Sequence, residues 1–296
     1  MKHLFILNPV AGNGKKTAQA RAEIIATMAN HGEEWEIYET TAPRDATQKV
    51  IAATQTTKPL RIYACGGDGT LSECVNGAVG LPHVAVTAFP TGTGNDFIKS
   101  FGAQKERFLN LNNLLNGQEM ALDVISLGGH YGINICSVGL DAKIGADVHK
   151  YSALPLLGGK TAYTISLLAN VLGRIATKLS VSVLDKTHTK PFTLICICNG
   201  QSYGGAFTPV PQAQPHDGIL DILLVDEVPR WRILNLVGRY KAGKFKELPH
   251  LITHIQSNSI TICADHEFAV NVDGEIFRKS EVTFTLVPGG VNFIAP

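Results

Sequence analysis

The sequence lacks an excess of charge of either sign. Its 26 Lys and Arg residues are balanced by 25 Asp and Glu residues, so the formal net charge is +1 over 296 residues. A chain without a global basic field is not expected to bind nucleic acid or to be held at a membrane by a polybasic anchor. Low-complexity segments and clear internal repeats are also missing, and the 45% hydrophobic content is typical of a globular protein.

Long apolar runs and metal-type cysteine spacings are missing as well. No stretch reaches 18 apolar residues, so no transmembrane helix is predicted, and the start of the chain lacks the length of a signal sequence. We interpret the cysteines as buried thiols in a reducing compartment, and the predicted location is the cytoplasm. None of the six forms a CxxC motif: they are Cys65, Cys74, Cys136, Cys196, Cys198 and Cys263.

The first 125 residues alternate strand-like and helix-like segments. Apolar strands are expected at 3–8, 34–40, 61–66 and 83–90, and helices at 16–32, 44–55, where Asp45 would cap the helix, and 70–80. This alternation predicts an α/β domain, residues 1–125, whose parallel sheet has helices on both faces.

The pattern changes after residue 125. Residues 126–296 contain strand-like runs separated by turns, with helical signals only at 160–175 and 231–244. We therefore predict a second domain, residues 126–296, that is a mainly β sandwich, and the final strand is expected to pack back on the first domain.

Three of the predicted strands in the first domain end in glycine-rich loops. These loops are NPVAGNGK (8–15), GGDGT (66–70) and PTGTGND (90–96). The carboxyl ends of parallel strands border the ligand crevice, and glycines there let backbone N–H groups approach phosphate oxygens. Each loop alone is also compatible with a simple turn or a helix cap. Three of them at one edge of a sheet predict a phosphate-binding site.

The two commonest nucleotide-binding motifs do not match these loops. A Walker A loop requires Gly-Lys followed by Ser or Thr, but Lys16 follows Gly14-Lys15. The dinucleotide motif GxGxxG fails because Gly92 and Gly94 are followed by Phe97.

The combined motifs resemble the diacylglycerol kinase catalytic family, in particular its soluble bacterial lipid kinases. The resemblance rests on NPVAGNGK, GGDGTLSECVNG, PTGTGNDF and NVDGE (271–275), and segments at 121–124, 134–142 and 198–225 extend it over nearly the whole chain. GGDGT alone is shared with NAD kinases and phosphofructokinases, whereas its combination with GTGND and VDGE is specific to lipid kinases. The resemblance implies a phosphofructokinase/NAD-kinase-like first domain and ATP bound between the two domains.

The resemblance also implies the positions of the site residues. Asp68, Asp96 and Asp123 would form an acidic network around a catalytic Mg²⁺, which prefers carboxylate oxygens. Gln214, Asp217 and Ile219 would hold a structural Mg²⁺, with Gln214 and Ile219 offering backbone carbonyls, although Asp217 is also compatible with a plain turn. ATP would contact Asn8, Pro9, Val10, Ala11, Gly12, Thr40, Gly66, Gly67, Asp68, Gly69, Thr70, Leu71, Ser72 and Thr93. Ser72 departs mildly from the family, where Asn is common.

A kinase that phosphorylates a hydroxyl group also needs a group that accepts the hydroxyl proton. A carboxylate is the usual acceptor, and the resemblance points to the VDGE turn, where Asp273 and Glu275 share one face of a strand. We favour Glu275 as the catalytic proton acceptor, with Asp273 as its orienting partner. The spacing alone does not choose between them, and the VDGE segment is also compatible with a plain hairpin turn that has no catalytic role.

The sequence therefore predicts an ATP- and Mg²⁺-dependent lipid kinase that converts diacylglycerol, or a similar lipid, to phosphatidic acid at the membrane surface. The alternatives are an NAD kinase-like enzyme, disfavoured by the PTGTGNDF loop, and an inactive nucleotide- or lipid-binding module, disfavoured by the filled acidic positions. The acceptor lipid and the oligomeric state, including a homodimer, remain open. An apolar stripe would dock on the bilayer or pack against the sandwich: Ile165, Leu168, Val171, Leu172 and Ile175.

Overall fold

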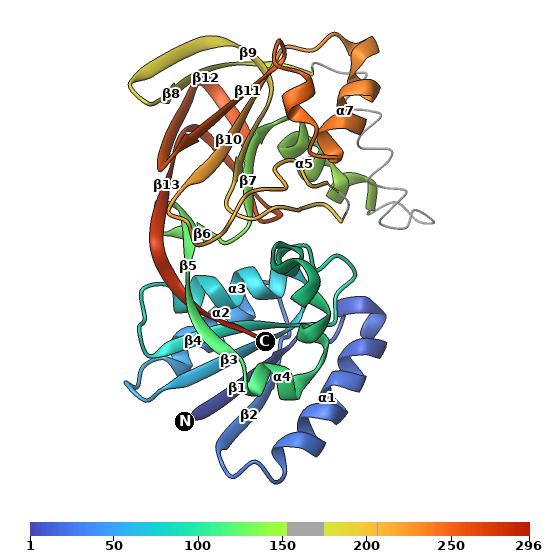
Figure 1. Cartoon of the computed structure of the whole chain (residues 1–296), viewed down its shortest axis with the longest axis vertical. Helices are drawn as coiled ribbons and strands as arrows, with labels where there is room; N and C mark the ends of the chain where they lie inside the picture. Colours follow the sequence, from blue (N-terminus) through green and yellow to red (C-terminus); the bar gives the residue numbers. More distant parts are fainter. Residues whose placement is uncertain (153–174, 206) are drawn as a thin grey trace.

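The structure is a computed structural model that describes residues 1–152, 175–205 and 207–296 (Figure 1). An α/β N-terminal part is followed by a strand-rich C-terminal part, in agreement with the predicted two-part layout. The helix expected at 160–175 and four members of the apolar stripe (Ile165, Leu168, Val171 and Leu172) lie outside the described residues. Its last member, Ile175, is buried in a core of the C-terminal part.

Four parallel strands form the sheet of the first part, in the order β4-β3-β1-β2. The helices that connect them cover both faces. The connection from β1 to β2 crosses the sheet in one direction, and the connections from β2 to β3 and from β3 to β4 cross it in the opposite direction. Because such connections are right-handed, α1 lies on one face and α2 and α3 lie on the other (Figure 1). The elements are β1 (Lys2–Leu7), α1 (Lys15–Met28), β2 (Glu34–Glu39), α2 (Asp45–Ala53), β3 (Leu60–Gly66), α3 (Asp68–Ala78) and β4 (Val84–Pro90).

Burial explains why these segments form strands and helices. All but the first residue of β1 are buried, as expected for a parallel strand covered on both faces. On α1, Ala20, Ile24 and Met28 are buried at four-residue spacing, so one stripe of the helix faces the sheet. Asp45 is the first residue of α2 and Arg44 is the N-cap, so Asp45 does not cap the helix as expected; its carboxylate instead accepts a hydrogen bond from the Thr41 N–H (2.7 Å).

The strand order creates a switch point between β1 and β3. From β1 the chain crosses to β2 on one side, and from β3 it crosses to β4 on the other. The loops after β1 and β3 therefore diverge at their carboxyl ends and leave a crevice, which is where ligands bind in open α/β sheets. Both loops are glycine-rich loops of the predicted phosphate site.

The C-terminal part consists of long antiparallel strands. The pairing of β12 with β13 has an irregularity between Cys263 and Phe268. The strands are β5 (Gln118–Leu127), β6 (His130–Gly132), β7 (Ile135–Gly139), β8 (Thr177–Val183), β9 (Lys186–Cys198), β10 (Leu220–Asp226), β11 (Ile252–Ser257), β12 (Ser259–Val272) and β13 (Glu275–Ala295).

The last strand connects the two parts. β13 begins in the C-terminal sandwich, pairs with β5, and ends beside β4, where Asn292 and Phe293 pair in parallel with Ala85 and Val86 (Figure 1). The Thr87 hydroxyl also donates to the Ile294 carbonyl (2.8 Å). The final residues of the chain therefore extend the sheet of the first part and hold the two parts together.

Helices fill the remaining connections. α5 was not expected from the sequence, whereas α7 falls within the predicted helical region 231–244. Within the described residues, every helix is too short or too polar to span a bilayer. Five of the six cysteines are buried free thiols and Cys263 is half-buried. The helices are η1 (Ala11–Gly14), η2 (Phe97–Leu109), α4 (Leu111–Leu115), α5 (Leu140–Ser152), η3 (Arg230–Arg232), α7 (Ile233–Lys241) and η4 (Phe245–Glu247).

Candidate active site

The loop after β1 is held against the start of α3. The Asn8 side-chain amide donates to the Thr70 hydroxyl (3.2 Å), and its carbonyl oxygen accepts from the Val10 N–H (3.1 Å). The Thr17 hydroxyl donates to the Asn8 backbone carbonyl (3.1 Å) and lies 3.2 Å from the Thr91 hydroxyl. The first and third glycine-rich loops therefore meet through a small polar network, as their shared sheet edge predicts.

Gly12 marks the closest approach of these two loops. Its φ angle of +56° lies in the left-handed region, and an added Cβ would sit 2.3 Å from the Thr91 carbonyl oxygen. A side chain at this position would therefore meet both backbone strain and a fixed backbone atom.

We expect Gly12→Ala to distort the loop and to raise the KM for ATP while lowering the free energy of unfolding. Gly32→Ala is the matched control, because Gly32 also has a positive φ (+77°) but nothing lies within 4 Å of its added Cβ. The control should lose about 1 kcal/mol of stability through strain alone. Equal stability loss in the two variants, with an unchanged KM for ATP in both, would contradict this assignment of Gly12.

A cavity of about 300 Å³ opens at the carboxyl ends of β1 and β2, beside the start of α3. Five of the residues predicted to contact ATP line it: Asn8, Pro9, Val10, Thr40 and Thr70. The Thr40 hydroxyl donates to the Leu7 carbonyl (3.3 Å), which holds the end of β2 against β1. The cavity thus joins residues from three separate loops.

The other residues predicted to contact ATP surround the start of α3 or lie on the third loop. Gly66 and Gly67 lead into the helix, Asp68 and Leu71 face the second part of the chain, and Gly69 and Thr93 are exposed. Ala11 lies next to Gly12 in η1. Ser72 is buried, and among the described residues its hydroxyl has no hydrogen-bond partner.

Asp68 is the first residue of α3 and faces the third loop. Its Oδ1 accepts a hydrogen bond from the Phe97 N–H (3.0 Å), and its Oδ2 would lie 3.2 Å from a Cβ added at Gly94. Burial raises the pKa of this carboxyl, and the nearby Asp96 carboxylate raises it further. Burial and the neighbouring charge destabilise the ionised form of Asp68, and a bound cation would offset this cost.

Asp96 bridges the two parts of the chain. Its Oδ2 accepts from the Gly205 N–H (2.6 Å), and its Oδ1 pairs with the Lys99 ammonium. The same Oδ2 would lie 3.7 Å from a Cβ added at Gly94. The carboxylate is buried, which leaves it few solvent contacts. The third glycine-rich loop is therefore attached to the C-terminal part through a charged side chain.

Asp123, the third predicted member of the acidic network, is bonded to backbone groups of the C-terminal part. Its two oxygens accept from the N–H groups of Gly218 and Gly289 (2.8 Å each), and its own N–H donates to the Pro215 carbonyl (2.8 Å). Asp123 thus packs against the loop that contains Gln214, Asp217 and Ile219. In that loop the Ile219 N–H donates to Asp217 Oδ1 (3.1 Å), which is the hydrogen-bond pattern of a turn.

The donor atoms at Asp68 and Asp96 fit a hard cation that keeps some of its water. Both carboxylates flank Gly94, and Mg²⁺ usually takes one or two protein carboxylates. Across the described residues, the one set of three potential ligands within 4.8 Å of one another is instead His3, His31 and Glu33. His3 is already paired there, with Tyr63 (2.9 Å) and Glu33 (2.6 Å).

A cavity of about 440 Å³ lies between the two parts of the chain. Asp68, Gly94 and Asp96 line it from the first part, and Asn134, Tyr203 and Asp273 line it from the second. Carboxylates from distant positions in the sequence therefore face a common space. This central cavity adjoins the start of α3, where the residues predicted to contact phosphate also lie.

Asp273 is held in the central cavity by backbone hydrogen bonds. Its carboxylate accepts from the N–H groups of Ile133 (2.6 Å), Asn134 (3.1 Å) and Ile135 (2.9 Å). Its φ of +49° is a strained conformation for a residue other than glycine. Burial raises the pKa of Asp273 to about 6, against the three N–H bonds that favour the carboxylate, and the Asp68 charge raises it further.

Glu275 is not among the described residues that line the central cavity. Its Oε2 lies 3.7 Å from His130 Nε2, and its side chain is 33% exposed. The two candidate bases of the VDGE turn therefore have different surroundings: Asp273 faces the carboxylates of the first part, and Glu275 faces β6.

Sequence reasoning did not single out an apolar cavity that adjoins the central one. Asp141, Tyr203 and Phe207 line both cavities, and the second holds about 60 Å³ between α5, β9 and α7. The Tyr203 hydroxyl donates to Asp141 Oδ2 (3.1 Å) and lies 3.2 Å from the Tyr240 hydroxyl. Burial raises the pKa of Asp141. The segment NICSVGLDA, which contains Asp141, is the sequence signal that could have pointed to this cavity.

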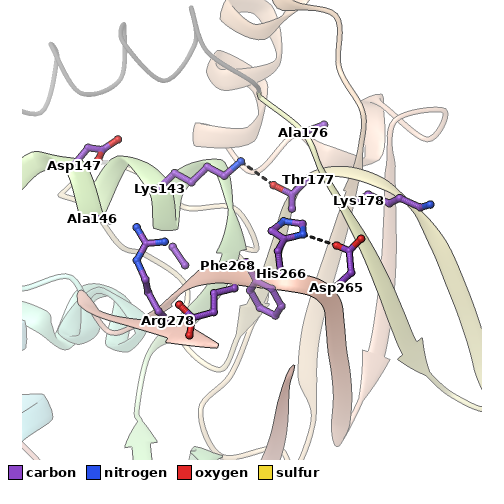
Figure 2. Close-up of a pocket in the computed structure, with 12 residues that line it drawn as sticks. Lys143, Ala146, Asp147, Ala176, Thr177, Lys178, Asp265, His266, Phe268 and Arg278 are labelled. Atoms are coloured by element: carbon purple, nitrogen blue, oxygen red, sulfur yellow. Dashed lines mark hydrogen bonds and ion pairs between the residues drawn. The ribbon is translucent and has the colours of Figure 1, made fainter. Parts of the chain in front are cut away.

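A larger hollow of about 530 Å³ lies away from these residues, on the sandwich (Figure 2). Figure 2 shows Lys143 bonded to Thr177 (2.7 Å) and His266 bonded to Asp265 (2.6 Å). None of its described lining residues belongs to the predicted site. We therefore place the candidate active site in the smaller central cavity, because predicted site residues line that cavity.

Two family models match the chain. The model described as a diacylglycerol kinase catalytic domain matches residues 2–127. The model described as a YegS C-terminal NAD kinase beta sandwich-like domain matches residues 134–295. The second match covers the part that holds Asp273, and the first covers the three glycine-rich loops.

Named relatives and solved structures agree with these matches. Proteins of Staphylococcus aureus strains Mu3 and Newman, each named "putative lipid kinase", are 26% identical over 235 and 237 residues, which is 79% of this chain and 76% of each relative. A structure from Bacillus anthracis strain Sterne described as a "putative diacylglycerol kinase" has a TM-score of 0.78 at 23% identity and covers 100% of this chain and 95% of its own. Another, described as a diacylglycerol kinase of the same strain, has a TM-score of 0.70 at 21% identity, covering 100% and 97%. These two structures share the fold.

Proposed function

The chain belongs to the diacylglycerol kinase catalytic family, and we propose that it is an ATP- and Mg²⁺-dependent kinase for a hydroxyl group of diacylglycerol or a similar lipid. The observation that carries this proposal is the central cavity, where Asp68 of the first part and Asp273 of the second face one space beside the glycine-rich loops. Phosphoryl transfer depends on positioning and on charge neutralisation, and this arrangement supplies groups for both.

In this proposal ATP lies along the carboxyl edge of the parallel sheet. The nucleoside occupies the 300 Å³ cavity between the loop after β1 and Thr40. The phosphates then cross the N-terminus of α3, where backbone N–H groups and the helix dipole favour negative charge. The γ-phosphate ends in the central cavity near Asp68. Mg²⁺ held at Asp68 and Asp96 would neutralise phosphate charge.

The acceptor hydroxyl attacks the γ-phosphorus from the side of the C-terminal part. The new bond joins the acceptor oxygen to phosphorus, the bond from phosphorus to the bridging oxygen of ADP breaks, and the hydroxyl proton passes to a carboxylate. We assign that proton to Asp273, because Asp273 lines the central cavity with Asp68 and its pKa is raised to about 6. Glu275, favoured from the sequence, then acts at a distance from the reacting atoms.

The apolar cavity behind Tyr203 and Phe207 supports a lipid acceptor. Its walls include Leu140, Leu194 and Leu236, and it opens beside the polar groups of Asp141 and Tyr203. A glycerol-like head group would bond to the polar rim while the first methylene groups of an acyl chain bury apolar surface. NAD offers no comparable apolar chain, which favours a lipid over a dinucleotide.

Competition among acceptors tests this proposal. The purified protein is incubated with Mg²⁺, ATP labelled in its γ-phosphate, diacylglycerol in detergent micelles and NAD together. Label is expected in the lipid extract as phosphatidic acid. Label in NADP would make the protein an NAD kinase, and label in neither acceptor would support an inactive binding module.

A further inference from the structure

The outer side of α7 and its flanking turns forms a strongly basic surface. Between Val228 and Lys246 the chain has six Lys and Arg residues and no Asp or Glu, although the whole chain has a net charge of only +1. Five of the six are exposed and Arg239 is partly exposed. We call this set the basic α7 face: Arg230, Arg232, Arg239, Lys241, Lys244 and Lys246.

An exposed tryptophan stands at one end of the basic α7 face. Trp231 lies in η3 and is 76% exposed, which is unusual for the largest apolar side chain. The Arg232 guanidinium stacks over its ring at 4.5 Å, and Arg230 and Arg232 flank it along the chain. A tryptophan set among arginines is typical of a segment that sits at the interface between water and a bilayer.

The inner side of α7 faces the candidate active site. Ile233, Leu236 and Tyr240 are buried, and all three line the apolar cavity that adjoins the central cavity. The same helix thus presents charge outward and an apolar wall toward the acceptor cavity. A lipid that enters past α7 would reach the apolar cavity before it reaches Asp273.

Acidic neighbours neutralise only part of this charge. Glu247 lies 4.0 Å from Arg239 and 3.6 Å from Lys244, and the exposed Glu227 precedes the face in the sequence. Both pairs are at least partly exposed to water, where such pairs are weak. The excess of positive charge therefore faces solvent and favours an anionic partner with an extended surface.

We propose that the basic α7 face docks the protein on an anionic lipid bilayer, with Trp231 inserted among the head groups. The proposal rests on the proposed lipid kinase function, since docking there brings bilayer lipids to the apolar cavity. Juxtamembrane basic residues gain attraction from anionic lipids, and an interfacial tryptophan adds apolar contact. Phosphatidylglycerol in the bilayer supplies the required negative charge.

Tryptophan fluorescence gives a direct test of insertion. The chain has two tryptophans, so the Trp35→Phe variant leaves Trp231 as its single tryptophan. With phosphatidylglycerol vesicles, the emission of Trp231 is expected to shift to the blue and to become protected from an aqueous quencher. Vesicles of phosphatidylcholine alone should produce neither change, and added salt should reverse the effect because it screens the attraction.

Charge reversal tests the assignment of the surface. Arg230→Glu together with Arg232→Glu should weaken vesicle binding at least ~30-fold in a sedimentation assay. The control is Lys58→Glu with Lys105→Glu, which makes the same change in net charge at exposed lysines of the first part. Equal binding by the two double variants, equal binding to both vesicle types, or no binding to either would overturn the proposal. The last outcome would leave the basic α7 face to an acidic macromolecule other than a bilayer.

A soluble acceptor separates failure of docking from failure of the proposed function. With a short-chain diacylglycerol below its micelle concentration, the Arg230→Glu/Arg232→Glu variant should match the wild type in turnover. Loss of vesicle binding with unchanged soluble turnover supports the proposal. If the wild type phosphorylates no soluble or vesicle lipid but still binds anionic vesicles through Trp231, the kinase assignment fails while the docking surface stands.

Discussion

Asp68→Asn is expected to lower kcat at least ~100-fold, the scale of a lost electrostatic contact to the transferring phosphate. The amide keeps an oxygen that can accept from the Phe97 N–H, so the turn into α3 should keep its shape. What disappears is the negative charge beside Gly94, where Asp68 and Asp96 would hold Mg²⁺ in the proposed site. Kinetics over a range of Mg²⁺ concentrations should show that excess metal does not restore the rate.

The stability of this variant provides the control. Burial raises the pKa of Asp68 in the folded protein, so the folded state disfavours its charged form above the unfolded pKa. Removing the charge should therefore leave the melting temperature at neutral pH unchanged or higher. A well-folded Asp68→Asn protein with near-normal kcat would contradict the role of Asp68 at the phosphate, and a large loss of stability would assign it to folding.

Asp273→Asn is expected to reduce turnover by roughly 10²–10⁴-fold, the contribution of a positioned general base. Calorimetric titration should find ATP affinity nearly intact, because the residues proposed to bind the nucleoside lie on the other part of the chain. The amide can replace only some of the contacts to Ile133, Asn134 and Ile135, so a stability loss of about 1–3 kcal/mol is also expected. Rates must therefore be compared below the unfolding transition.

The pH dependence distinguishes a base from a structural residue. Asp273 must be ionised to accept a proton, and its pKa is about 6, so kcat should fall as the pH drops through about 6. The residual activity of Asp273→Asn should lack this inflection. Because the folded pKa is raised, protonation stabilises the folded state, and a loss of activity at pH 5 cannot be attributed to unfolding by this group.

Glu275→Gln is the matched comparison within the same turn. We expect a much smaller fall in turnover, since Glu275 faces His130 outside the lining of the central cavity. If Glu275→Gln abolishes turnover while Asp273→Asn keeps it and the inflection near pH 6, the roles are reversed and the original sequence-based preference is right. If either variant loses ATP affinity with kcat unchanged, that residue belongs to nucleotide binding.

Much of the first part follows from elementary rules applied to the sequence. Alternating segments predict a parallel sheet, and parallel strands place their carboxyl ends at one edge, so the meeting of Asn8 with Thr70 is expected. The sequence also predicts that the glycines of the first loop, Gly12 among them, allow another group to approach the backbone closely. The identity of Gly12's neighbour, the Thr91 carbonyl, depends on packing between loops and appears only in three dimensions.

Long-range contacts account for most of what the sequence could not predict. Asp123 accepts from Gly218 and Gly289, which lie 95 and 166 residues further along the chain, and no local pattern encodes such pairings. Asp273 and Glu275 look equivalent in a strand alternation, yet the turn at Asp273 has a positive φ that breaks it. The basic α7 face was hidden because a balanced total charge says nothing about how charge is distributed.

The most direct measurement of the central claim follows the γ-phosphate of ATP into lipid, by mass, for the wild type and for Asp68→Asn and Asp273→Asn. We predict that the wild type, with Mg²⁺, converts diacylglycerol to phosphatidic acid. The lipid mass should increase by that of one phosphoryl group, and one ADP should form for each lipid converted. Both variants should form this product at least ~100-fold more slowly. A wild-type protein that hydrolyses or retains ATP without transferring phosphate to any lipid, or variants that transfer it at the wild-type rate, would contradict the assignment of the central cavity as a lipid kinase active site.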